Sequence, residues 1–295
     1  MARVIIIGLL LLTVLSCTRP KDSPEIRFTL LPSSVTGIAF NNTITESDSL
    51  NMFANEYTYM GGGVAVGDFN KDGLPDLFFT GSQVSSRLYL NKGDCRFEDI
   101  TAKARVSTTG WCTGVTVVDI NNDGWPDIYV CVSGKVPGVR RKNLLFINQH
   151  DLTFKEEAEA YGLADTAYST QAVFFDYDHD GRLDMYLVNH TLDETFPNKI
   201  RDRKIDSGAV AADKLFHNEG IPAGKDHPVF KDVSNLQTKH GLNVIGYWVP
   251  NDDSPAWKDT LSTLSLIPAR TTRKRTGTHF MLTQSFYPTE MRLCL

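Results

Sequence analysis

The sequence predicts an all-β protein, a β-propeller of four-stranded blades, and three observations lead to this prediction. A nine-residue acidic motif occurs three times, each copy lies between short β-like runs, and the first aspartates of the copies are 51 and 57 residues apart. That spacing is the length of one four-stranded blade with its loops. Because propellers close with about four to eight blades, the chain is expected to form an incomplete sector of about three blades.

Residues 1–16 are predicted to be a secretory signal peptide. Arg3 precedes the apolar run Val4–Leu15, which is shorter than the about 20 residues of a membrane-spanning helix. Val14–Cys17 resembles a bacterial lipobox, so we expect Cys17 to be lipidated and residues 17–39 to form a stalk. The alternative is an ordinary signal peptide with an incidental cysteine. Both interpretations predict export, and the first predicts a membrane anchor of lipid.

Residues 40–235 are predicted to hold the repeats. The motif Asp-x-Asn/Asp-x-Asp-Gly-x-x-Asp forms a first loop at 68–76, a second loop at 119–127 and a third loop at 176–184. Each repeat should contribute four short strands, two flanking the loop, one at a Leu-aromatic-x-Asn element and one at a following aromatic residue. Continuous apolar runs indicate strands buried on both faces. The expected strands are 63–66, 77–79, 88–91 and 97–99, then 114–118, 128–130, 145–148 and 154–156, then 172–175, 185–188, 215–218 and 230–232.

The three loops have the ligand chemistry of calcium. They contain 10 of the 25 aspartates in the chain, and calcium takes about six to eight oxygen ligands that short carboxylates on a tight loop can supply. Glycine at position 6 permits the positive φ that curls the chain around an ion. Positions 1, 3, 5 and 9 would bind through side chains and position 7 through its backbone carbonyl. The predicted ligands are Asp68, Asn70, Asp72, Leu74, Asp76, Asp119, Asn121, Asp123, Trp125, Asp127, Asp176, Asp178, Asp180, Arg182 and Asp184.

The third loop is expected to bind calcium most tightly, because it offers four ligand carboxylates where the other two offer three. Asp, Asn and Gly also form ordinary turns without a metal, but three copies in one register favour calcium sites. All positions in the coordination shell would be filled by protein, so the ions are expected to be structural and not catalytic.

Charge and cysteine content limit the remaining possibilities. The formal charge of −5 gives no reason to expect nucleic acid as a partner. The cysteines have no zinc-like spacing, and Cys112 and Cys131 flank a hairpin out of step with each other, so no disulfide is predicted. Residues 236–295 carry no further motif and are interpreted as disordered, or as a frameshifted or truncated remainder of a longer gene. Their basic run Arg270–Arg275 favours a solvated tail over a nucleic-acid or membrane patch.

The stretch Gly63–Asp76 resembles the FG-GAP/VCBS repeats of integrin α-subunit propellers. Tyr59–Gly63, Leu88–Gly93 and Phe97–Thr101 resemble, more narrowly, the bacterial relatives of cartilage acidic protein. That ASPIC/UnbV family commonly has a further C-terminal domain, which the motif pattern here lacks, and many members are surface lipoproteins of the Bacteroidota. The resemblance implies a propeller, calcium at the three loops and binding more than catalysis.

We therefore expect a calcium-stabilised recognition or adhesion module at the cell surface that is not an enzyme and that binds a glycan or protein ligand. Trp111, Trp125 and Tyr168 are candidates for stacking on sugars, although core packing is the commoner use of such residues. One alternative is a glycan-processing hydrolase built on the propeller, but the chain has no Gly-x-Ser-x-Gly or His-Glu-x-x-His motif. Another is a structural spacer without a ligand.

Overall fold

The computed structural model describes residues 29–48, 50–53, 57–134, 141–190 and 213–234. All the described helices and strands lie between Ser33 and Asp232. The predicted signal peptide, Cys17 and the 236–295 tail are outside the described residues. Within the described part of the chain, no helix is long and apolar enough to cross a membrane.

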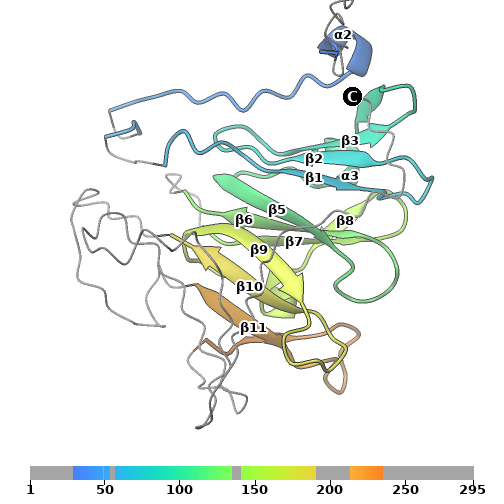
Figure 1. Cartoon of the computed structure of the whole chain (residues 1–295), viewed down its shortest axis with the longest axis vertical. Helices are drawn as coiled ribbons and strands as arrows, with labels where there is room; N and C mark the ends of the chain where they lie inside the picture. Colours follow the sequence, from blue (N-terminus) through green and yellow to red (C-terminus); the bar gives the residue numbers. More distant parts are fainter. Residues whose placement is uncertain (1–28, 49, 54–56, 135–140, 191–212, 235–295) are drawn as a thin grey trace, which may run out of the picture. The chain divides into compact units, whose positions relative to one another are not determined.

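The prediction of an all-β fold with four strands per repeat is confirmed. Three antiparallel sheets follow one another, each with its strands in chain order (Figure 1). We call them the first, second and third blades of a partial propeller. Their strands are β1 Val64–Gly67, β2 Asp76–Phe79, β3 Arg87–Asn91 and β4 Phe97–Asp99; then β5 Cys112–Val118, β6 Asp127–Val132, β7 Leu144–Asn148 and β8 Phe154–Glu156; then β9 Ser169–Phe175, β10 Asp184–Asn189, β11 Lys214–Asn218 and β12 Phe230–Asp232.

Short helices were not predicted from the sequence. The four-residue helices α3 (Thr101–Ala104) and α4 (Ala158–Tyr161) follow the fourth strands of the first two blades. Another four-residue helix, α2 (Ser33–Thr36), lies in the stretch expected to be a stalk. Four residues are too few to show a helical period, so these turns leave no pattern in the sequence. Ala104 and Ala158 on α3 and α4 are fully buried in the core.

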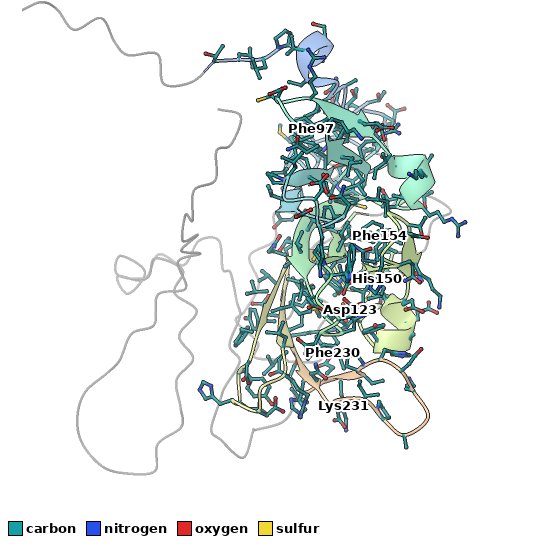
Figure 2. All side chains as sticks on the ribbon, turned by 90° about the vertical axis from the view of Figure 1, so that its right-hand side faces the viewer. Phe97, Asp123, His150, Phe154, Phe230 and Lys231 are labelled. Carbon is teal, nitrogen blue, oxygen red and sulfur yellow. The ribbon has the colours of Figure 1, made fainter. Side chains whose placement is uncertain are left out.

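The core lies between neighbouring blades. One cluster joins the first and second blades through residues such as Phe78, Leu88 and Ile128, and another joins the second and third through residues such as Tyr129 and Met185. Every residue of β6 is buried, as expected for its continuous apolar run. The same expectation is wrong for β1 and β9, which are only partly buried. Figure 2 labels the equivalent aromatic residues of the fourth strands, Phe97, Phe154 and Phe230.

The cysteines differ in part from expectation. Cys112 and Cys131 are buried free thiols, and Cys112 lies opposite Val132, so the two are out of step as predicted. The expectation of no disulfide is wrong at Cys95, which forms a disulfide. Cys95 lies in the turn between β3 and β4 at a φ of 56°. Its spacing from the other cysteines gave no sign of this bond.

Candidate metal centres

Each acidic loop connects the first and second strands of a blade. The last ladder pairs before the loops are Gly67 with Asp76, Val118 with Asp127, and Phe175 with Asp184. Position 9 of every motif therefore opens the second strand at the same register. Because the ladder begins there, the position 9 aspartate is drawn into the sheet, and all three such residues have an exposed fraction of 0%.

The backbone of the three loops is curled in the same way. Glycine at position 6 has a φ of 87°, 83° and 84° in the first, second and third loops, which confirms the expected left-handed conformation. Position 4 is also left-handed, with φ of 57° at Lys71, 57° at Asn122 and 63° at His179. The sequence did not reveal this second feature, because asparagine and histidine favour such an angle but the lysine of the first loop does not, so the three positions share no residue type that predicts it.

The carboxylate at position 1 binds the backbone that curls around it. In the first loop Asp68 accepts hydrogen bonds from the N–H groups of Asp72 at 3.1 Å and Gly73 at 2.9 Å. Asp119 and Asp176 accept the equivalent pairs in the other loops, all between 2.8 and 3.1 Å. Position 1 thus holds the same turn in each repeat.

The buried carboxylate at position 9 connects the loop to the third strand of its blade. Asp127 accepts hydrogen bonds from the backbone N–H of Ile120 at 3.2 Å and of Asn148 at 2.8 Å. Asp76 and Asp184 accept the equivalent pairs. Sequence reasoning treated the asparagine of the Leu-aromatic-x-Asn element only as part of a strand and missed this role. The signal was its recurrence as the last residue of the same element in every repeat, as Asn91, Asn148 and Asn218.

Burial perturbs these acids. Removal from water raises the pKa of Asp76 to about 6 and that of Asp127 to about 7, against the lowering effect of their backbone hydrogen bonds. Burial likewise raises the pKa of Asp184. A buried carboxylate near other carboxylates is costly in its charged form, so each loop favours either a proton or a cation at position 9.

The third loop differs from the first two at position 3. The side-chain amides of Asn70 and Asn121 donate to the position 5 carboxylates of Asp72 and Asp123, at 2.8 Å in both loops. Asp178 has no N–H to donate, and its Oδ1 is buried without a hydrogen-bond partner. The position 5 carboxylate of the third loop, on Asp180, is instead ion-paired with the guanidinium of Arg182.

A histidine also faces the third loop. The Nδ1 of His217 is 3.1 Å from Oδ1 of Asp184 and 3.7 Å from Oδ2 of Asp178. One ligand atom from each of Asp178, Asp180 and His217 lies within 4.8 Å of the others, as do ligand atoms from Asp176, Asp178 and Asp184. These oxygen and nitrogen donors and the partnerless oxygen of Asp178 fit a divalent cation. Within the described residues, it is the third loop that gathers three such side chains so closely.

The candidate aromatic residues have separate environments. Trp125 stacks on His150 with ring centroids 4.8 Å apart, and the Lys71 ammonium lies 4.7 Å from the Trp125 ring. His150 also contacts Asp123 of the second loop, with Nε2 to Oδ2 at 3.0 Å (Figure 2). Trp111 is buried in the core, whereas Tyr168 carries the Arg141 guanidinium 3.6 Å from its ring centroid. The structure thus brings Trp125 to the loops and keeps Trp111 in the core.

His190 lies among polar and aromatic side chains. Its Nδ1 is 3.3 Å from the hydroxyl oxygen of Ser133, and its ring centroid is 4.1 Å from the ring centroid of Tyr57, with the two planes tilted at 52°. Burial, together with the nearby Arg141 charge, lowers its pKa to about 4. Tyr57, Trp111, Ser133 and His190 help to line one small hollow.

Comparison with known proteins agrees with this geometry. The FG-GAP-like repeat family matches residues 68–130, which contain the first two loops. Cartilage acidic protein 1 of Mus musculus is 30% identical over 132 residues, covering 43% of this chain and 20% of that protein. The match thus spans about a fifth of the relative's length. Residues 68–130 carry an FG-GAP-like repeat, and the chain is similar to cartilage acidic protein 1.

Proposed function

We propose that this chain is a calcium-stabilised recognition or adhesion module outside the cell, which binds a glycan or protein ligand and catalyses no reaction. One observation carries the proposal. The same acidic loop is built three times, with the same hydrogen bonds to positions 1 and 9 around a fully buried carboxylate. A loop repeated in this way is a structural unit of the blade and not a single reaction centre.

Calcium would bind the side-chain oxygens at positions 1, 3, 5 and 9 and the carbonyl at position 7. The ion would supply the positive charge that three or four clustered carboxylates need. The protein contributes the shape of the loop: the left-handed residues at positions 4 and 6 and the N–H donors at both ends hold the turn. The buried aspartate couples each turn to the sheet, so an ion there would stabilise the whole blade.

The similarities support a place outside the cell. The relative is named for cartilage, and the sequence begins with a signal-peptide pattern ending at Cys17. We accordingly propose export and anchoring to the outer membrane by a lipid on Cys17. Mass spectrometry of membrane fractions would show the added acyl mass on wild type, and its loss in Cys17→Ala.

A binding experiment separates the proposed function from its rivals. The purified chain is applied to arrays of glycans and of outer-membrane proteins, with calcium and with a chelator. Asp127→Asn tests the second loop, and Asp94→Asn is the matched control, because Asp94 is exposed in a turn at a φ of 49°, where asparagine is tolerated.

Calcium-dependent retention that Asp127→Asn weakens and Asp94→Asn leaves intact would support recognition. Turnover of a glycan, lost on changing a single carboxylate outside the loops, would favour the hydrolase. Absence of any ligand on either array, with calcium still raising the melting temperature, would favour a structural spacer.

A further inference from the structure

The third blade places a histidine where the other two blades place aliphatic residues. His217 occupies the third position of Leu-aromatic-x-Asn, which is Leu90 in the first blade and Ile147 in the second. Leu90 and Ile147 are 6% and 5% exposed and belong to the apolar clusters between blades. The imidazole of His217 is only partly buried, with 21% of its side chain accessible, and it lacks the apolar packing of its counterparts, so it calls for another interaction.

That interaction lies on the loop side. The His217 Nδ1 is directed at the carboxylates of Asp184 and Asp178, at 3.1 and 3.7 Å. The same loop is the one whose position 3 is an aspartate with a buried oxygen that has no hydrogen-bond partner. Two departures from the repeat, Asp178 and His217, therefore face each other across one loop.

We propose that the third loop binds a first-row transition-metal dication of the zinc class, through Nδ1 of His217 and the carboxylates of Asp178 and Asp180, while the first two loops take calcium. This inference rests on the proposed function only in assuming that a cation occupies the loop. Imidazole nitrogen suits zinc, copper, iron and nickel, whereas all-oxygen sites suit calcium and magnesium. Zinc binds histidine nitrogen and carboxylate oxygen together at about 2.0–2.2 Å.

The second loop provides an internal contrast. His150 also contacts a loop carboxylate, Asp123, but through Nε2 and from an exposed position, with 48% of its side chain accessible and its ring stacked on Trp125. No group of three metal-ligating His, Cys, Asp or Glu side chains is found around His150 in the described structure. His150 therefore lies beside one carboxylate, whereas His217 belongs to a group of three possible metal ligands.

The test is zinc titration of the full chain without an added affinity tag, followed by calorimetry in the presence of saturating calcium. We expect one zinc ion per chain, and at least a tenfold loss of zinc affinity in His217→Leu, which installs the residue of the first blade. Asp178→Asn, which installs the residue of the first two loops, should weaken zinc binding similarly. His150→Leu should leave zinc affinity unchanged.

Zinc X-ray absorption adds a readout that does not depend on folding differences between variants. An imidazole nitrogen shell in wild type that is absent in His217→Leu would support the site. No zinc uptake above calcium, or zinc uptake equal in wild type, His217→Leu and Asp178→Asn, would overturn it. If zinc binds as expected but calcium binds nowhere, the zinc site stands, and the assignment of calcium to the first two loops fails together with the calcium part of the proposed function.

Discussion

The first two loops and the third loop have the same backbone conformation but differ in how their charges are balanced. In the first two, an asparagine amide at position 3 donates to the position 5 carboxylate at 2.8 Å. In the third loop, position 3 is Asp178, and Asp180 at position 5 is ion-paired with Arg182. His217 of β11 lies close to the Asp178 carboxylate. The hydrogen bonds at positions 1 and 9 are nevertheless the same. The turn is therefore determined by positions 1, 6 and 9, and the charge balance by position 3 and its neighbours.

Removal of bound cations is expected to have the largest effect. A site filled at 100 times its Kd adds about 2.7 kcal/mol to the free energy of unfolding. Stripping all three loops with EDTA should lower the urea midpoint strongly, and calcium alone should restore the contribution of the first two loops. A midpoint that EDTA leaves unchanged would contradict the calcium proposal.

Truncation at position 9 should have the next largest effect. Asp127→Ala leaves the buried N–H groups of Ile120 and Asn148 without an acceptor, and each buried unsatisfied donor costs about 1–3 kcal/mol. We expect a loss of about 2–6 kcal/mol of unfolding free energy in urea, even without metal. Asp184→Ala should cost more, because it leaves the equivalent two N–H groups without an acceptor and also removes the contact of His217 Nδ1 at 3.1 Å. Equal losses would show that the two loops are equivalent.

The raised pKa of Asp127 predicts a pH dependence in the metal-free protein. An aspartate in the unfolded chain has a pKa of about 3.9, whereas burial raises the pKa of Asp127 in the folded chain to about 7. Asp127 therefore stays protonated to a higher pH in the folded state than in the unfolded state. The contribution of this group to the free energy of unfolding is present below pH 4 and is lost as the pH rises to 7. We expect a loss of about 2–4 kcal/mol.

The measurement is the difference in unfolding free energy between wild type and Asp127→Asn at pH 4 and pH 7. Taking this difference cancels the carboxylates common to both proteins. Calcium should reverse the trend in wild type, because it binds the charged form. A difference in unfolding free energy that is constant across this pH range would show that the pKa of Asp127 is not raised.

The smallest expected effect is the difference in stability cost between replacing equivalent asparagines in the second and third blades. Asn148 donates through its side chain to the carbonyl of Phe69 in the first blade at 2.9 Å, as well as to Pro126. The amide of Asn218 donates to Leu183 within its own blade. Asn148→Ala should therefore cost about 1 kcal/mol more than Asn218→Ala. Equal melting temperatures of the two variants would show that the contact between blades adds nothing.

Much of this could be predicted from the repeat. The same short apolar runs recur around the same loop in each repeat, and this recurrence predicted twelve strands. The structure forms these strands with ends shifted by a few residues, as at β5, which begins at Cys112 instead of residue 114. The glycines at position 6 were predicted correctly because their φ is a local requirement. Helices α3 and α4 were missed because a single turn has no period.

The sequence by itself determined the strands, the three loops and the identity of their acidic residues, because these depend on local backbone geometry and on side-chain type. Only the tertiary structure decided that Asp76, Asp127 and Asp184 are fully buried, that a strand asparagine supports each of them, and that His217 faces Asp178. Those facts join residues more than 30 positions apart in the third blade. They depend on strand pairing and blade packing, which no local pattern encodes.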